Sequence, residues 1–508
     1  MAELEVAGPA RTGAADGGGR ARFRTLARQL IGPGKLPVTV GVLLVLAVPQ
    51  LYLLPEGLID VPLSTFWTLL LAPGVLLCVL RTPDRALLRD RLVQVLLALL
   101  GIRVAALLWS PEPRAGLQSI IVLGQFLLSI ALFVRLTRLG AEPLRRIQRW
   151  YWPWVLAEVA LVLLFRFQPG IEDAFLRSVG GFFAGQNTVA ALYADRPNNV
   201  FDDAKSGGVF VNANVAAMFL GVNGLAGLAL ASITGSRWAR LVGVAALVAV
   251  PFTGSKSATV LVVVLPALAF AAYRLRRGMT AVVRRTLLGA AAGLVALGIA
   301  VLVVNRSFLD ALVEAFVVRT EIWQYGAEAF GRTPLLGLGY GGWDIGFGRY
   351  ALEHDIYRVF PPHNLLLAAW AVTGVVGLAL TLGYVGFVAR AVVRGGRLGV
   401  PDRFVAYAGA ALAWTVIQGM GENTDIFGDI HFIPIVALLI AYLIRPGLRD
   451  RPDGEEPSGD DPAADRGDPA APAVPAVGDL HREPGAGAAD LPAAAGGEGS
   501  GSRQHPPG

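Results

Sequence analysis

The sequence predicts an all-α, polytopic integral membrane protein of about twelve transmembrane helices with a large extracytoplasmic loop. Three observations predict this class. The 508 residues are 54% hydrophobic and only 16% charged, whereas soluble proteins carry about 25% charged residues. Apolar runs near the length of a bilayer crossing recur along the chain, and basic residues gather in every second connection between them. This composition excludes an ordinary soluble enzyme and a disordered scaffold.

Transmembrane helices are predicted where an apolar run approaches the roughly 20 residues that a helix needs to cross a bilayer. The predicted cores lie at 36–54, 61–80, 92–109, 117–135, 150–165, 209–232, 238–252, 255–273, 286–304, 363–389, 404–420 and 432–444. The single cysteine, Cys78, cannot form an intramolecular disulfide and rules out a Cys-rich metal site. Packing and the bilayer must therefore hold the fold together.

Arginine and lysine predict the orientation of these helices. Every even-numbered connection is basic with almost no acid, while the odd-numbered connections are short or mix both signs. Because positive charge favours the cytoplasmic side, we expect a multi-pass protein of the cytoplasmic (inner) membrane with both termini in the cytoplasm. The net charge of +6 is explained by these connections, and we do not interpret it as nucleic-acid binding.

The chain is expected to have three parts. Residues 1–35 form a cytoplasmic N-terminal segment, which is not a cleaved signal peptide because the apolar run after it is too long. Residues 36–445 form the transmembrane domain. Residues 446–508 are rich in Pro, Ala, Gly and Asp and cannot bury enough apolar surface to fold, so we expect a disordered cytoplasmic tail.

Two extracytoplasmic loops are long, at about 166–208 and 305–362. Long ordered loops tend to carry function. The second loop contains a predicted amphipathic helix on the membrane surface, VEAFVVRTEIWQYGAEAF. Its spacing places Phe316, Arg319, Trp323 and Ala327 on one face. A helix that only caps the bundle would show the same pattern.

His363 is the first candidate for chemistry, in VFPPHNLLLAAW, where the chain enters the tenth predicted span from outside. A histidine with an ordinary pKa near 6.5 can accept a proton at neutral pH. The alternative is an interfacial histidine that starts a helix together with Asn364. On its own, the histidine fits the second interpretation better.

Two cations are further candidates on the same predicted side of the membrane. Lys256, in TGSKSATV, stands at a helix start, where a cation opposes the helix dipole unless it serves an anion. Arg319 has a forked guanidinium that suits phosphate oxygens. The alternatives are a lysine that reaches lipid headgroups and a surface ion pair of Arg319 with Glu314 or Glu321.

Asn212 and Asn214, in GGVFVNANVAAM, begin the sixth predicted span and could cap the helix or bind a sugar. Asn214, Lys256, Arg319 and His363 come from four parts of the chain, yet all are expected near the outer membrane boundary. Two cations, a candidate base and an amide at one depth suit a lipid-borne anion and a hydroxyl acceptor. The candidate substrate-binding residues are Asn212, Asn214, Trp323, Tyr340 and Asn364.

The segment GLGYGG at 337–342 matches G-x-G-x-x-G but lacks the strand and helix of a dinucleotide-binding unit. Its glycines are interpreted as turns that let the backbone approach a ligand or the bundle. No Walker motif or HExxH helix occurs.

Several of these segments together resemble the O-antigen ligase / O-antigen polymerase family. The resemblance rests on FVNANVAA, on RTEIWQYGAEAFGRTPLLGLGYGGW, and on HNLLL followed by TGVVGLAL, over about residues 205–385. Ligases of the family transfer a glycan from undecaprenyl-diphosphate to an acceptor hydroxyl at the outer face of the cytoplasmic membrane. The resemblance implies such a role in cell-surface polysaccharide biosynthesis, with lipid-linked donor and glycan or lipid acceptor as partners. It also implies that the reaction uses no cofactor, no metal and no nucleotide.

By the same resemblance His363 would be the base or would position the acceptor, and Arg319 and Lys256 would bind the diphosphate. Lys256 stands where the family usually has an arginine, so the charge is kept and the fork is lost. The alternatives are a repeat-unit polymerase of the same family, a transferase for protein or teichoic-type acceptors, and a polysaccharide transporter.

Overall fold

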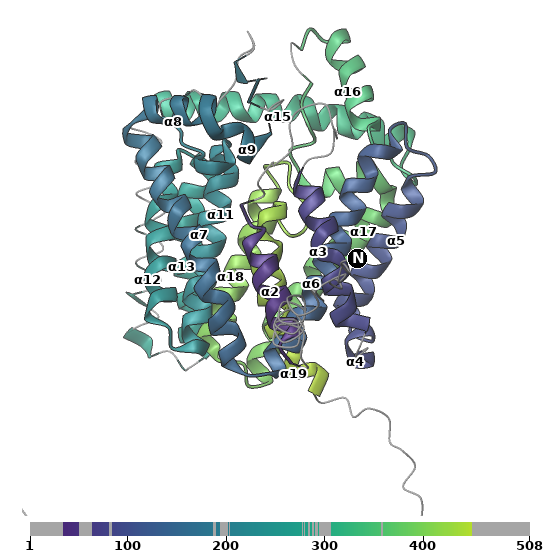
Figure 1. The fold of residues 1–508 in the computed structure, drawn as a ribbon. Helices are drawn as coiled ribbons and strands as arrows, with labels where there is room; N and C mark the ends of the chain where they lie inside the picture. The colour runs from purple at the N-terminus through teal and green to yellow at the C-terminus, as the bar shows by residue number, and fades with distance from the viewer. Residues whose placement is uncertain are drawn as a thin grey trace, which may run out of the picture. The chain divides into compact units, whose positions relative to one another are not determined.

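The computed structural model describes residues 34–49, 63–80, 84–185, 204–276, 306–356 and 359–449, with short pieces between 189 and 202 and between 278 and 293. Within these residues the chain is helical, with one isolated bridge between Asp425 and Gly428 and no strand. Figure 1 shows long helices side by side in a bundle. The all-α prediction is confirmed for this part of the chain.

Each predicted span except 286–304, which lies almost wholly outside the described residues, coincides with a helix. The helices are α2 (Leu36–Leu46), α3 (Leu63–Leu80), α5 (Arg91–Ala106), α6 (Pro113–Arg138), α7 (Ala141–Phe167), α11 (Ala213–Thr234), α12 (Arg237–Ala249), α13 (Lys256–Arg276), α17 (Leu365–Arg397), α18 (Asp402–Gly419) and α19 (Ile433–Arg449). Five described helices, α6, α7, α11, α13 and α17, are long and apolar enough to cross a membrane, and shorter apolar helices accompany them. The count of twelve spans stays a prediction.

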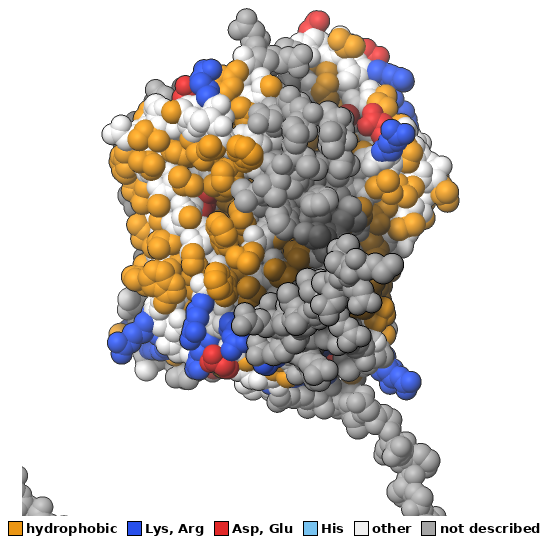
Figure 2. Space-filling view, viewed as in Figure 1, with side chains coloured by type: hydrophobic (Ala, Val, Ile, Leu, Met, Phe, Trp, Pro, Cys, Tyr) orange, Lys and Arg blue, Asp and Glu red, His pale blue; other side chains and the backbone are white. Residues whose placement is uncertain are grey.

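The surface has the charge distribution of a membrane protein. Figure 2 shows a broad hydrophobic band on one face of the bundle, with mainly lysine and arginine side chains below it and both signs of charge above it. The exposed side chains of Leu268 and Leu275 belong to the long apolar helix α13, and those of Leu241 and Val248 to the shorter helix α12. A soluble protein would expose such faces to water at a large cost, so this surface indicates contact with lipid.

Local signals in the sequence explain several helix ends. The α11 helix stops at Gly235, which has a φ of 69°, and the hydroxyl of the next residue, Ser236, caps α12 by accepting from the backbone N–H of Ala239 at 3.1 Å. The predicted break between spans 238–252 and 255–273 is present. The short helix η3 (Val250–Thr253) and Gly254 separate α12 from α13.

Both long predicted loops contain helices at one end of the bundle, which we call the loop end (Figure 1). The first contains α8 (Pro169–Phe175), η1 (Leu176–Gly180) and α9 (Gly181–Ala184); η2 (Gly208–Phe210) follows, just before α11. The second contains α15 (Arg306–Arg332) and α16 (Gly342–Glu353). Helix α15 runs across the loop end, transverse to the bundle helices, as the surface-helix prediction requires.

The buried face of α15 lies beside the face named from the sequence. Ile322, Tyr325 and Ala329 are buried, whereas Ala327 is exposed. Arg319 and Trp323 are half-buried and lie beside that face. Packing decides which face is buried, because the apolar stripe that starts at Ile322 packs on α16 and α17 in the smaller of two core clusters.

A break in α17 anchors the second loop to the bundle. Gly374 has a φ of 66° inside this helix, and a Cβ there would overlap the carbonyl of Leu335. The carbonyl of Ala371 accepts from Leu338 N–H at 2.6 Å, and Pro334 accepts from Val375 N–H at 3.1 Å. The glycines of GLGYGG at 337, 339 and 341 all have positive φ and contact neighbouring backbone or side chains, which confirms their interpretation as turns.

Candidate functional site

A cavity of about 500 Å³, called the first cavity below, lies at the loop end. Its walls come from the segment before α11, the segment before α17, and the connection 420–432 between α18 and α19. Polar side chains line it from all three: Lys205, Asn212, Asn214, His363, Glu422, Asn423, Thr424 and Asp429. Three stretches that are far apart in the sequence therefore surround one space.

His363 lines this cavity with a backbone conformation that few residues adopt. Its φ is 45°, in the left-handed region that costs energy for a side chain larger than glycine's. Asn364 follows as the N-cap of α17, and its Oδ1 accepts from two backbone N–H groups of the first turn, at 2.9 and 3.1 Å. Because Pro361 and Pro362 restrict the chain on the other side, the position of the imidazole is well determined.

Glu422 is a candidate that the sequence analysis missed. Its Oε1 accepts a hydrogen bond of 2.8 Å from Asn214 Nδ2 and lies 3.9 Å from Arg319 Nη2. Burial raises the pKa of Glu422 to about 7, although Arg319 and Asn214 both favour its ionised form. A carboxyl group that titrates near neutral pH in the same cavity as a histidine can take part in proton transfer. In the sequence, Glu422 is one of several acids in a polar connection, which gives no specific signal.

Arg319 reaches the edge of the first cavity from α15. Its Nη2 donates to the carbonyl of Gly421 at 3.1 Å, next to the Glu422 carboxylate. The Arg319 side chain is 31% exposed, so an anion at this edge can still approach the guanidinium. Glu422 is a carboxylate partner of Arg319, and the alternative of an ion pair with Glu314 or Glu321 stays a prediction.

Asn212 and Asn214 have different roles. Asn212 caps α11, because its Oδ1 accepts from the backbone N–H of Asn214 at 2.9 Å. Asn214 binds the connection 420–432 through Glu422, and its own carbonyl accepts from Gln418 Nε2 at 2.8 Å. The capping expected for at least one of the two is thus confirmed for Asn212, while Asn214 orients the Glu422 carboxylate.

Of the two lysines Lys205 and Lys256, only Lys205 lines the first cavity. Lys256 begins α13 and is exposed, and it does not line the first cavity. Lys205 does line it, with its Nζ 3.3 Å from Asp202. The two are close in the fold, because the backbone N–H of Ser206 donates to the carbonyl of Thr253. The predicted role of Lys256 in binding the diphosphate stays a prediction. Lys205 lines the same cavity as His363.

Trp323, Tyr340 and Asn364 do not line the first cavity. Tyr340 is buried, and its hydroxyl donates to the carbonyl of Arg103 at 3.3 Å. Trp323 packs against the smaller core cluster, and Asn364 caps α17. Their contacts hold the loop end in place, and their proposed role in substrate binding stays a prediction.

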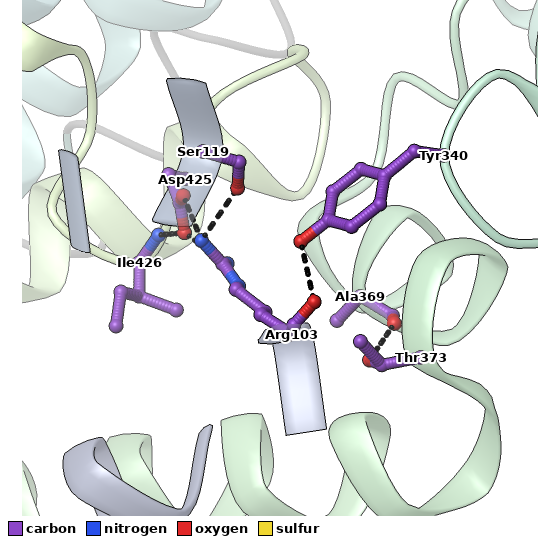
Figure 3. Close-up of polar contacts among 7 residues, drawn as sticks. All are labelled: Arg103, Ser119, Tyr340, Ala369, Thr373, Asp425 and Ile426. Atoms are coloured by element: carbon purple, nitrogen blue, oxygen red, sulfur yellow. Dashed lines mark hydrogen bonds and ion pairs between the residues drawn. The ribbon is translucent and has the colours of Figure 1, made fainter. Parts of the chain in front are cut away.

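A second cavity, of about 400 Å³, adjoins the first and shares Asn423, Thr424 and Asp429 with it. At its wall Arg103 donates two hydrogen bonds of 2.7 Å to the two oxygens of Asp425 and one of 3.0 Å to Ser119 Oγ (Figure 3). The sequence analysis noted Arg103 as an ionisable residue inside a span that either pairs or faces a cavity. In the structure it does both.

The first cavity thus combines proton-accepting groups with cations at its edge. His363 and Glu422 can each accept or release a proton. Lys205 and Arg319 can compensate negative charge that develops on a ligand. Within the described residues, no three His, Cys, Asp or Glu side chains gather into a group that could hold a metal ion. The arrangement suits an anionic ligand that reacts with a hydroxyl group.

Comparison with known proteins assigns this part of the chain to a family. Residues 241–382, from within α12 to within α17, match the family model described as O-antigen ligase. The match confirms the resemblance predicted from the sequence and includes Lys256, Arg319 and His363. It excludes Asn214 and the connection 420–432. The comparison with curated proteins gave no match.

Proposed function

We propose that this protein, whose residues 241–382 form an O-antigen ligase domain, is a membrane glycosyltransferase of cell-surface polysaccharide biosynthesis. It transfers a glycan from undecaprenyl-diphosphate to an acceptor hydroxyl at the outer face of the cytoplasmic membrane. The loop end then faces outward, and both termini lie in the cytoplasm. The predominantly basic end of the bundle supports this orientation (Figure 2).

One observation carries the proposal: His363, Glu422 and Lys205 line a single cavity, with Arg319 bound at its edge. The cavity thus joins a proton-accepting group that titrates near neutral pH to two cations. A transferase that acts on a diphosphate-linked sugar needs both. The family match and the apolar helices support the membrane setting.

The reaction we propose is a single displacement. The acceptor oxygen forms a bond to the anomeric carbon while the bond from that carbon to the diphosphate oxygen breaks, and the diphosphate leaves with the electron pair. His363 takes the proton of the acceptor hydroxyl. Arg319 and Lys205, with Lys256 nearby, compensate the charge that grows on the diphosphate. Direct displacement inverts the configuration at the anomeric carbon, and the leaving diphosphate supplies the driving force without a nucleotide.

The test uses the full-length protein purified in lipid nanodiscs, with a polyprenyl-diphosphate-linked glycan as donor and a panel of hydroxyl acceptors. His363→Ala should lower the transfer rate by about 10²- to 10⁴-fold, the usual contribution of a general base. His354→Ala is the matched control, because His354 is exposed at the end of α16 and stacks on Tyr350. Undiminished transfer by folded His363→Ala protein would remove the imidazole from the mechanism.

The same assay separates the ligase from the polymerase alternative. A polymerase would extend the lipid-linked glycan itself, and its products would grow in length without an added acceptor. A ligase would give one product per acceptor molecule. Flux of a lipid-linked glycan across vesicles without any transfer would instead favour the transporter.

A further inference from the structure

The second cavity takes no part in the mechanism above, although polar and apolar side chains both line it. It lies between α5, α6, α17 and the connection 420–432, beside the first cavity. Asn423 and Thr424 line both cavities, so a ligand in one would lie next to a ligand in the other. A transferase needs two substrates, and the first cavity has the charges for only one of them.

Arg103 and Asp425, two of the three charged residues that line the second cavity, compensate each other. Both oxygens of Asp425 accept from Arg103 at 2.7 Å, and these side chains are only 23% and 10% exposed, respectively. Asp429 accepts from the backbone N–H of His431 at 3.2 Å and also contacts its ring. The lining contains no other charged residue. Arg103 is the one cation of this lining, and its two hydrogen bonds to Asp425 leave it poorly placed to bind a phosphate group.

The remaining lining is mixed. Gln118 and Asn423 supply amides and Ser119 a hydroxyl, while Leu99 and Val372 supply apolar surface. Both amides belong to exposed side chains, so a polar ligand in the cavity can reach them. A sugar ring has hydroxyl groups at its edge and C–H groups on its face, so it can use both kinds of surface. The volume of about 400 Å³ falls within the range of small-molecule sites.

We propose that the second cavity binds a neutral, hydroxyl-rich sugar residue of the acceptor, next to the donor diphosphate in the first cavity. The connection 420–432 then separates the two substrates, and the shared residues Asn423 and Thr424 mark where the acceptor hydroxyl meets the donor sugar. The Arg103–Asp425 pair shapes the pocket and presents polar edges that carry no net charge. This inference deepens the proposed function and rests on it.

The test measures binding without turnover. Methyl glycosides of common neutral hexoses and N-acetylhexosamines are titrated into the full-length protein in nanodiscs, with saturation-transfer NMR as the readout. Inorganic pyrophosphate is titrated separately as a probe of the first cavity. At least one neutral glycoside should bind, and pyrophosphate should not displace it.

Two variants change the second cavity with little risk to the fold, because Ala115 and Gln118 are exposed on α6 at its wall. Gln118→Leu should weaken glycoside binding about tenfold, as expected for the loss of one or two hydrogen bonds. Ala115→Trp should fill the space and abolish binding. Both should leave pyrophosphate binding unchanged. Gln94→Leu is the matched control and should have no effect. Gln94 is exposed near the start of α5 and does not line the second cavity.

The inference is overturned if no glycoside of the panel binds, if glycoside binding survives Ala115→Trp, or if pyrophosphate and the glycoside compete. Its failure differs from that of the proposed function. Full transfer by His363→Ala with the expected glycoside pattern would reject the mechanism and keep the second site. If His363→Ala abolishes transfer but Ala115→Trp leaves glycoside binding unchanged, the second site is rejected and the mechanism is kept.

Discussion

Glu422 and Asp425 are three residues apart in one connection, yet their surroundings give them opposite properties. The Glu422 carboxylate faces the first cavity, accepts one hydrogen bond from an amide, and lies 3.9 Å from Arg319. Burial raises its pKa to about 7. Burial would also raise the pKa of Asp425, but the charge and hydrogen bonds of Arg103 and the N–H of Ile426 hold it below the ordinary value.

The difference shows how partners decide what a buried acid can do. Asp425 has two direct bonds to a guanidinium at 2.7 Å and stays ionised, so it serves as a structural charge. Glu422 has a more distant cation and can change its protonation state near neutral pH. Each acid borders a different cavity, so one connection supplies a reactive wall to the first and a neutral wall to the second.

The largest effect on folding is expected from Asp425→Asn, which leaves the Arg103 charge buried beside a neutral amide. Loss of one partner of a buried ion pair costs about 3–5 kcal/mol. Thermal unfolding of the variant in nanodiscs, measured by intrinsic tryptophan fluorescence, should show a markedly lower midpoint at every pH from 6 to 8.

The matched control is Glu328→Gln, which breaks the exposed pair of Glu328 with Arg332 on α15. Exposed pairs contribute about 0–1 kcal/mol, so its unfolding midpoint should stay near that of the wild type. Equal midpoints for Asp425→Asn and the control would show that the Arg103–Asp425 pair does not hold the loop end together.

Glu422→Gln should change activity more than folding. Because the pKa of Glu422 is near 7, transfer by the wild type should rise as the pH passes through this value and Glu422 ionises. The variant should lose the part of this rise that Glu422 causes, and about tenfold or more of the rate above pH 8. Initial rates between pH 5.5 and 8.5, at saturating donor, provide the measurement. A rise near pH 7 that persists in the variant would exclude Glu422 as its source.

The same group predicts a stability effect with a defined sign. Its folded-state pKa is raised from 4.5 to about 7, so the folded protein binds the proton more tightly than the unfolded chain does. The contribution of Glu422 to stability is therefore present below about pH 4.5 and is lost as the pH rises through 7. Glu422→Gln should remove that loss, so its unfolding midpoint at pH 8 should exceed that of the wild type.

A smaller effect should distinguish the two lysines. Lys205 lines the first cavity and Lys256 does not, so Lys205→Ala should raise the KM for the lipid-linked donor about tenfold, the loss of one charge-assisted contact. Lys256→Ala should raise it less. Steady-state kinetics with varied donor at fixed acceptor decide the order. A larger effect of Lys256→Ala would restore the assignment made from the family motif.

Much of the fold could be predicted because the bilayer imposes a length and a composition on each span. Short stretches of sequence were enough to predict three features: the break between α12 and α13, the capping by Asn212, and the turns of GLGYGG. The buried face of α15 could not be predicted in this way. Apolar residues at helical spacing lie on two neighbouring faces of this helix, and only packing on α16 and α17 decides which of them is buried. The predicted span 286–304 and the predicted tail 446–508 lie almost entirely outside the described residues.

The candidate site was only partly predictable. His363 follows two prolines and Asn214 starts an apolar helix, so both stood out in the sequence. Glu422 and Asp425 did not stand out, because an acidic connection between two apolar helices is typical of a solvated loop. Lys205 was passed over for Lys256, since the family motif favours the residue that begins α13.

The sequence by itself determined that the chain is a bundle of apolar helices, which residues cap them, and which family residues 241–382 resemble. These features depend on hydropathy and on contacts between near neighbours, which a linear pattern records. The tertiary structure alone decided that Glu422 would meet Asn214 and Arg319, and that Asp425 would meet Arg103 from 322 residues away. The charge state of a buried acid depends on the partners that folding brings to it, and no local pattern specifies those partners.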